Sequence, residues 1–232
     1  MRPLPRAVNS PELLDEPRHD ARVLEQSLGH VAAVNRWLGG ARALLQHAAP
    51  LFERGRTTRV LDVGTGSADL PRKLVEWARA HDMPVAVTAT DLHPQMREIA
   101  SAACRDYPEI AIGEADALHL PFAENAFDFA TLSLTLHHFD EPDQITILRE
   151  LARVSTKAVI VNELKRTRLN YVGAKLLGLT FWRGNPLTRH DGPLSVLRAF
   201  TRHELEQLCA AAGLRGRVYE HYFQRVVLVI DA

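Results

Sequence analysis

One stretch of the sequence constrains the fold more than any other: an apolar run at residues 59–63, two glycines two residues apart, and an amphipathic segment at residues 68–81. The apolar run is aliphatic and β-branched, which is typical of a buried parallel strand. The later segment places Leu70, Leu74 and Trp77 at helical spacing. Glycine lets the backbone turn sharply and lets a ligand lie against it without meeting a Cβ atom. The stretch therefore predicts a nucleotide-type site in an open α/β sheet.

The glycine turn places Asp62, Gly64, Gly66 and Ala68 at every second position. A dinucleotide site instead has the pattern G-x-G-x-x-G and holds a pyrophosphate at the helix N-terminus. An acid beside the glycines suits a cationic ligand and would repel a diphosphate. The turn resembles motif I of the class I S-adenosylmethionine (SAM)-dependent methyltransferases, acid-x-Gly-x-Gly-x-Gly, with Ala68 in place of the third glycine. The alternative is an ordinary glycine-rich turn that binds nothing.

The resemblance implies a SAM site built from the ends of successive strands. Asp62 would meet the ammonium of the methionine end, directly or through water. Asp91, at the end of a predicted strand at residues 85–90, would accept both ribose hydroxyls. Asp116 would accept from the adenine amine while Ala117 lets the ring lie flat; helix capping is the alternative role of both Asp91 and Asp116. The predicted cofactor-binding set is Asp62, Gly64, Thr65, Gly66, Asp91, Leu92, Met96, Asp116, Ala117, Ser133 and Leu134.

Three histidines are candidates for a general base: His138, His137 and His190, in that order. The first two follow a predicted strand at residues 126–132, whose end should face the same crevice. Imidazole titrates near neutral pH, although a purely structural role is the alternative for each. Adjacent side chains should point to different sides, one toward the cofactor and one into the packing layer. No carboxylate, cysteine or further histidine stands at a metal-ligand spacing from the pair, so the sequence indicates no metal site.

Strand and helix patterns alternate from residue 57 onward, which indicates a parallel sheet. Further strands are expected at residues 110–113 and 158–161, and two more at residues 217–223 and 226–230 should form an antiparallel hairpin. The predicted fold class is therefore α/β, with a seven-stranded, mostly parallel sheet, helices on both faces and a C-terminal antiparallel hairpin. A sheet closed by such a hairpin is also what the resemblance implies.

Two domains are expected on this basis. Residues 1–56 read as helices, one of them starting at Ser10, and predict an N-terminal helical cap. Residues 57–232 predict the Rossmann-like SAM-binding domain. Residues 163–201 interrupt the alternation, and an insertion of this length is more often a functional lid than an inert loop. Within it, residues 183–193 look like a turn.

Composition narrows the range of partners. The chain has 232 residues, 46% of them hydrophobic, and a formal net charge of zero, so no basic excess indicates a nucleic acid as partner. Its two cysteines, Cys104 and Cys209, are expected to be buried free thiols. There is no secretion signal, and no apolar run approaches the ~18 residues that span a bilayer. We expect a cytoplasmic monomer or homodimer with a small-molecule acceptor and no membrane insertion.

The resemblance implies SAM-dependent methyl transfer to a small molecule, an aromatic or polyketide-type hydroxyl or carbon. The N-terminal helices and the insertion resemble small-molecule methyltransferases of type III polyketide synthase pathways, which would place the enzyme in secondary metabolism. One rival is an NAD(P)-dependent oxidoreductase, because Tyr171 and Lys175 have the spacing of the short-chain dehydrogenase pair; that family's glycine pattern is absent. Another is a non-catalytic SAM-binding protein on the same scaffold.

Overall fold

The computed structural model describes residues 4–8 and 10–232. Its strands form one sheet in the order β3-β2-β1-β4-β5-β7-β6. β1 to β5 are parallel, and β7 lies antiparallel between β5 and β6. The strands are β1 Thr58–Val63, β2 Val85–Thr90, β3 Ile110–Gly113, β4 Phe127–Ser133, β5 Ser155–Leu164, β6 Gly216–His221 and β7 Arg225–Asp231. The predicted fold class is confirmed.

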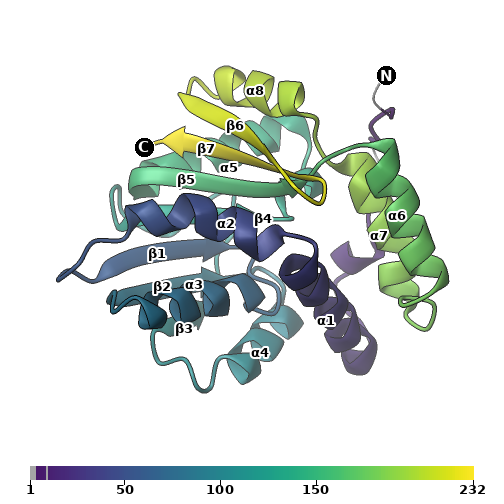
Figure 1. Cartoon of the computed structure of the whole chain (residues 1–232), viewed down its shortest axis with the longest axis horizontal. Coiled ribbons are helices and arrows are strands. Elements are labelled where there is room, and N and C mark those ends of the chain that lie inside the picture. Colours follow the sequence, from purple (N-terminus) through teal and green to yellow (C-terminus); the bar gives the residue numbers. More distant parts are fainter. Residues whose placement is uncertain (1–3, 9) are drawn as a thin grey trace.

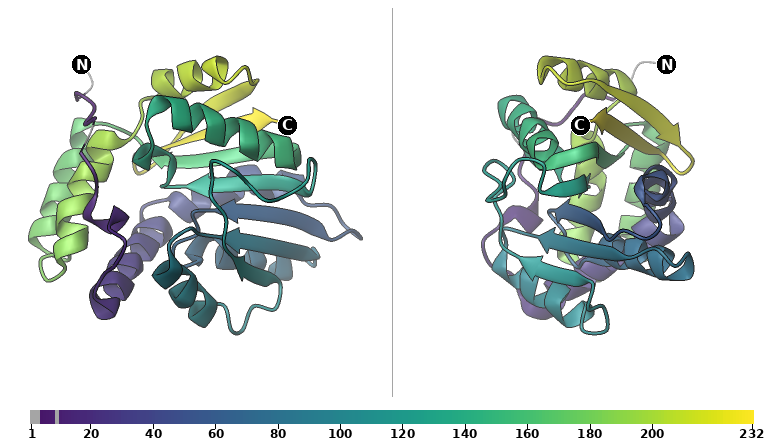
Figure 2. Two further views of the ribbon diagram at one scale, coloured as in Figure 1. Left: turned by 180° about the vertical axis from the view of Figure 1, so that it is seen from behind. Right: turned by 90° about the vertical axis from the view of Figure 1, so that its left-hand side faces the viewer.

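Helices cover both faces of this sheet (Figures 1 and 2). α2, α3 and α4 pack on one face, and α5 and α8 pack on the other. The helices are α1 Ala21–Trp37, α2 Gly40–Ala48, α3 Asp69–Ala80, α4 Pro94–Ala103, α5 Glu141–Val154, α6 Arg168–Leu179, α7 Pro186–Arg198 and α8 Arg202–Ala211, with short 3-10 turns at Leu13–Asp15, Ala49–Leu51 and Leu136–His138. Among the described residues, no helix is both long and apolar enough to cross a membrane.

The two hydrophobic cores explain why the central strands carry apolar residues on both faces. In β1, Leu61 contributes to the core under α5 and α8, whereas Val60 contributes to the core under α2 and α3. In β4, Leu132 contributes to the core under α5 and α8, and Phe129 contributes to the core under α2 and α3. Successive side chains of a strand point to opposite faces, so a strand covered on both sides needs apolar residues throughout.

Three helices lie beyond the carboxyl ends of the parallel strands, on the right in Figure 1: α1, α6 and α7. α6 packs on α7, and α7 packs on α1. The segment that carries α6 and α7 leaves and returns at one place, because Lys165 pairs with Phe200 and the Arg166 N–H donates to the Phe200 carbonyl (2.9 Å). We call residues 167–199 the α6–α7 excursion.

The structure corrects the predicted helix start at Ser10. The chain is extended there and makes only the short turn Leu13–Asp15. The Asp191 carboxylate from α7 accepts the N–H groups of Leu13 (2.9 Å) and Leu14 (2.9 Å). This tertiary contact pairs two backbone donors with α7 and holds the segment in place, so the local pattern does not decide the conformation.

The turn expected at residues 183–193 is also wrong, since most of it belongs to α7. Asn185 caps this helix by accepting the Thr188 N–H (3.0 Å), and Pro186 follows in the first turn. Gly192 lies inside this helix. A larger residue does not fit there, because its Cβ atom would come within 2.6 Å of the Trp182 ring. The glycine therefore serves close packing, not a turn.

Candidate active site

A cavity of about 1150 Å³ opens at the carboxyl ends of the parallel strands, beside α1, α6 and α7. Pockets for single small molecules typically measure about 300–1,000 Å³, so this one has room for a nucleoside and a second small molecule. Every residue predicted to contact SAM lines it. These residues are Asp62, Gly64, Thr65, Gly66, Asp91, Leu92, Met96, Asp116, Ala117, Ser133 and Leu134. The structure thus brings the predicted set together, while their individual contacts with SAM stay predictions.

The glycine turn adopts the backbone conformation that its sequence suggests. Gly64 and Gly66 have positive φ angles of 66° and 54°. A Cβ atom on Gly64 would lie only 2.5 Å from Oγ1 of Thr135, which follows β4. Ala68, in place of the third glycine of motif I, is also left-handed at φ 54°. That conformation costs an alanine roughly 1–2 kcal/mol, which explains why the family pattern has glycine here.

Asp91 lies directly after β2 and points toward the glycine turn. Its Oδ2 accepts the Gly66 N–H and its Oδ1 accepts the His93 N–H, both at 2.9 Å. Burial raises the pKa of this carboxyl group. The cap residue of α4 is His93, so Asp91 stands just outside that helix with its carboxylate at the cavity.

Asp116 is not a helix cap, because the described chain makes a turn there. Its Oδ1 accepts the Leu118 N–H (2.9 Å), and its backbone pairs with His119 in an isolated bridge. Asp116 and the neighbouring Ala117 both line the cavity. The capping alternative for Asp116 is therefore removed, and the predicted adenine contact remains open to test.

Asp62 is the most strongly perturbed acid of the cavity. It is 3% exposed, and the Thr131 hydroxyl donates to its Oδ1 (2.5 Å). Burial, with a smaller contribution from the like charges of Asp69 and Asp91, raises the pKa of Asp62 to about 7. A cationic partner beside such a buried carboxyl group strongly favours its ionised form and so lowers its pKa.

A buried polar link that the sequence did not reveal supports the same corner. Asn35 of α1 donates through Nδ2 to Oδ2 of Asp69 at the start of α3 (3.0 Å). Arg225 of β7 donates through Nη2 to Oδ1 of Asn35 (3.0 Å). Arg225 is fully buried, and this burial lowers its pKa to about 10. The link joins α1, α3 and β7, so helix α1 is tied to the first helix of the glycine turn.

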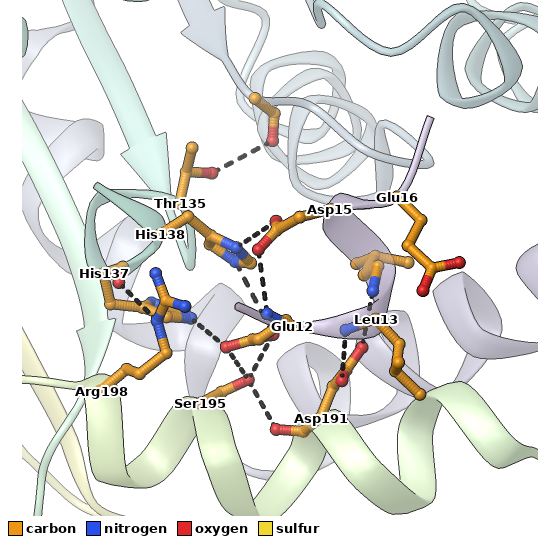
Figure 3. A network of polar contacts seen from close by, with 12 residues as sticks. Glu12, Leu13, Asp15, Glu16, Thr135, His137, His138, Asp191, Ser195 and Arg198 are labelled. Atoms are coloured by element: carbon orange, nitrogen blue, oxygen red, sulfur yellow. Dashed lines mark hydrogen bonds and ion pairs between the residues drawn. The ribbon is translucent and has the colours of Figure 1, made fainter. Parts of the chain in front are cut away.

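His137 also lines the cavity and lies between two carboxylates (Figure 3). Its Nδ1 is 2.8 Å from Oε2 of Glu163, and its Nε2 is 3.5 Å from Oε1 of Glu12. Burial alone would lower the pKa of His137, but the charges of Glu163 and Glu12 outweigh it and raise the pKa to about 10. The imidazole is therefore held as a cation when no other positive charge occupies this place.

His138 lies beside it and faces the same carboxylate. Its Nδ1 is 2.7 Å from Oδ1 of Asp15, and its Nε2 is 3.9 Å from Oε2 of Glu12. The expectation that the two histidines point to different sides is wrong, since both line the cavity with ring centroids 4.5 Å apart. They occupy a 3-10 turn, Leu136–His138, where side chains do not alternate as in a strand.

His190 is the one predicted catalytic residue that does not line the cavity. It lies on α7 with its side chain half exposed, and its Nδ1 is 2.7 Å from Oδ1 of Asp191. Its neighbour Asp191 holds the backbone of the N-terminal segment. We therefore remove His190 from the candidate bases.

The walls near the histidines are mostly apolar and come from α1 and the α6–α7 excursion. The apolar residues there include Val31, Val34, Leu38, Leu169, Ala174, Leu177, Trp182 and Val196. Tyr171 and Lys175, the basis of the oxidoreductase alternative, are absent from the lining. The Lys175 ammonium instead lies 5.4 Å from the centroid of the Tyr171 ring, as ordinary neighbours one helical turn apart.

Comparison with known proteins agrees with this geometry. Residues 60–158 match the family model described as a methyltransferase domain. A SAM-dependent methyltransferase from Aquifex aeolicus has the same fold, with a TM-score of 0.63 and 18% identity over 92% of this chain and 98% of that one. The chain thus has the fold of SAM-dependent methyltransferases, and its residues 60–158 are similar to a methyltransferase domain.

The curated relatives are named as a demethylmenaquinone methyltransferase and a ubiquinone/menaquinone biosynthesis C-methyltransferase. The chain is 29% identical to the demethylmenaquinone methyltransferase of Bacillus licheniformis over 173 residues, which is 70% of this chain and 72% of that protein. It is 31% identical over 100 residues to a ubiquinone/menaquinone biosynthesis C-methyltransferase of Rickettsia felis, covering 42% of this chain and 40% of the relative. The second match thus spans about two fifths of the relative's length.

Proposed function

We propose that the protein methylates a carbon or a hydroxyl oxygen of a small aromatic acceptor, of a quinol or polyketide type. The observation that carries this proposal is one cavity lined both by the predicted SAM-binding residues and by two histidines and apolar side chains of α1, α6 and α7. A flat, largely apolar molecule with one or two oxygens suits those walls. The quinone methyltransferases among the relatives support the same class of acceptor.

Bound SAM supplies a sulfonium methyl group: the acceptor's electron pair forms a bond to the methyl carbon while the carbon–sulfur pair stays on sulfur and leaves S-adenosylhomocysteine. The chain's own contribution is to position the two molecules and to exclude water. Asp62 provides negative charge for the ammonium end, and Asp91 provides acceptors for the ribose. The α6–α7 excursion covers the acceptor.

His138 is the residue we assign to the acceptor's proton. Asp15 holds its Nδ1, which leaves Nε2 facing the cavity side and Glu12. His137 is less suited to this role, because its raised pKa keeps it protonated at neutral pH. It acts behind His138 as the cation that neutralises Glu12 and Glu163.

Replacing His138 with glutamine should lower kcat for methyl transfer by about 10²–10⁴-fold, the usual contribution of a general base. The measurement is transfer of a radiolabelled methyl group from SAM to naphthols, naphthoquinols and phenols. Calorimetry with S-adenosylhomocysteine on the same variant separates a loss of chemistry from a loss of cofactor binding. The matched control is His190→Gln, which should retain wild-type kcat. A larger loss in His190→Gln than in His138→Gln would contradict the assignment.

Affinity for S-adenosylhomocysteine should rise as the pH increases from 5 to 7.5. In the ligand-free protein the pKa of Asp62 is about 7, so below that pH the carboxyl group must release its proton before it meets the ligand's ammonium. Between pH 5 and 7 Asp62 is more protonated in the folded state than in the unfolded state, where its pKa is near 3.8. The free energy of unfolding of the ligand-free protein should therefore fall as the pH rises across this range. Asp62→Asn should bind more weakly at pH 7.5 and flatten both dependences, as measured by calorimetry and thermal unfolding. An unchanged slope in Asp62→Asn would assign the titration to another group.

A further inference from the structure

Three side chains with metal-ligating atoms converge at the acceptor end of the cavity: Glu12, His137 and His138 (Figure 3). Nε2 of His137 is 3.5 Å from Oε1 of Glu12, and Nε2 of His138 is 3.9 Å from Oε2 of the same residue. One ligand atom from each lies within 4.8 Å of the others. Ligand atoms around a four-coordinate zinc ion lie ~3.3 Å apart, given bonds of ~2.0–2.1 Å. The three groups therefore need only small adjustments to share an ion.

The far side of each of these groups is held by a separate partner. Glu163 lies 2.8 Å from Nδ1 of His137, and Asp15 lies 2.7 Å from Nδ1 of His138. The Ser195 hydroxyl is 2.9 Å from both oxygens of Glu12. Histidines that bind metals usually donate their other ring N–H to a carboxylate in this way, which fixes the tautomer and leaves Nε2 with a free lone pair.

An unpartnered buried atom points to the same place. Nε2 of His137 is buried and has no hydrogen-bond partner among the described residues. The ring itself is 3% exposed. A buried imidazole nitrogen without a partner needs an explanation, and a bound ion supplies one. Glu12, Asp15 and Glu163 also place three carboxylates around the two rings, a charge that a divalent cation would balance.

We propose that Glu12, His137 and His138 bind a divalent first-row transition-metal ion, with the remaining coordination positions open to the cavity. Two imidazoles and one carboxylate suit Zn²⁺, Fe²⁺ or Co²⁺, whereas Mg²⁺ and Ca²⁺ prefer oxygen ligands alone. Three protein ligands with an open position are the arrangement of catalytic sites; structural zinc sites are closed by four. The sequence could not indicate this set, because Glu12 lies far from the histidine pair along the chain.

An ion at this place would change how the acceptor is activated, a consequence that rests on the proposed function. The ion would lower the pKa of the acceptor's hydroxyl, which would release its proton to water and bind the ion as an oxyanion, because Nε2 of His138 would be occupied by the ion. Acceptors with two oxygens on adjacent carbons would then be preferred, because both can fill open positions. Ion binding itself does not depend on which acceptor is used.

The test titrates Co²⁺ into full-length protein stripped with chelator, and follows the visible absorption of the bound ion; Zn²⁺ then competes it away. One ion should bind per chain. His138→Gln and Glu12→Gln should abolish the Co²⁺ spectrum. Asp15→Asn removes the charge behind His138 and keeps an oxygen that can accept the Glu12 N–H, and it should weaken binding roughly 10–100-fold. His203→Gln, an exposed histidine on α8, is the control for adventitious binding and should leave the spectrum unchanged.

Thermal unfolding and S-adenosylhomocysteine affinity, measured on each variant, separate loss of the ion from loss of the fold. The proposal is overturned if wild-type protein binds no stoichiometric Co²⁺, or if folded His138→Gln binds it as tightly as wild type. Methyl transfer by chelator-stripped protein at the full rate would overturn the metal's role in acceptor activation and leave the proposed function standing. Ion binding without methyl transfer to any aromatic acceptor would do the reverse.

Discussion

Asp91→Ala should weaken the binding of S-adenosylhomocysteine by about 100-fold or more. The carboxylate is predicted to accept two ribose hydroxyls, and each hydrogen bond to a charged group contributes about 1.5–3 kcal/mol. Its orientation is already fixed by the backbone N–H groups of Gly66 and His93, so binding needs little rearrangement. Isothermal calorimetry measures the loss directly.

The matched variant for Asp91→Ala is Asp91→Asn, which keeps the size and one acceptor oxygen and should lose less affinity. Thermal unfolding checks that the ligand-free variants fold; Asp91→Ala should lose some stability, because the carboxylate that accepts the Gly66 and His93 N–H groups is removed. Wild-type affinity in a folded Asp91→Ala protein would mean that the ribose binds elsewhere.

Gly64→Ala should destabilise the protein by roughly 2–5 kcal/mol, from the positive φ angle and from overpacking against Thr135. For a chain of this length that is a fall in Tm of about 5–15 °C. Calorimetric or fluorescence-detected unfolding of the ligand-free protein measures it. Rotation of the Thr135 side chain cannot relieve the whole clash, because the Cβ atom of Thr135 is itself only 3.1 Å from the added methyl group.

Two further variants separate strain from collision at Gly64. Gly66→Ala has the same sign of φ, but its nearest neighbour is the Leu28 side chain at 3.6 Å, so it should cost only the backbone strain of about 1–2 kcal/mol. Thr135→Ala removes the two closest atoms and should recover part of the loss when combined with Gly64→Ala. Equal losses in the two glycine variants would show that Thr135 moves aside freely.

The parts of this fold that could be predicted are those that neighbouring residues determine. The strands at Val85–Thr90 and Ile110–Gly113 have the predicted limits, and the glycine turn has the predicted backbone, because apolar runs and glycines act over a few residues. The predicted cofactor residues meet for a topological reason: the ends of adjacent parallel strands share one edge of the sheet. Both cysteines are buried and free, as expected.

The acceptor end could not be predicted because distant segments build it. Glu12 reaches the histidine pair only when α7 positions the N-terminal segment through Asp191 and Ser195. The buried contact of Arg225 with Asn35 likewise joins the two ends of the chain. No local sequence pattern predicts these long-range contacts, because each depends on how whole helices pack.

The α6–α7 excursion begins and ends where Lys165 pairs with Phe200, so this segment, which we propose covers the acceptor, could be exchanged as a unit. Because both ends of the excursion lie together, a foreign segment of another length can be spliced in at this point, and longer loops add little closure entropy. Grafted chimeras should differ in acceptor preference, while the predicted SAM-binding residues at the ends of β1, β2 and β4 stay unchanged. Evolution of acceptor preference in such enzymes can follow the same route, by replacement of the segment between these two ends.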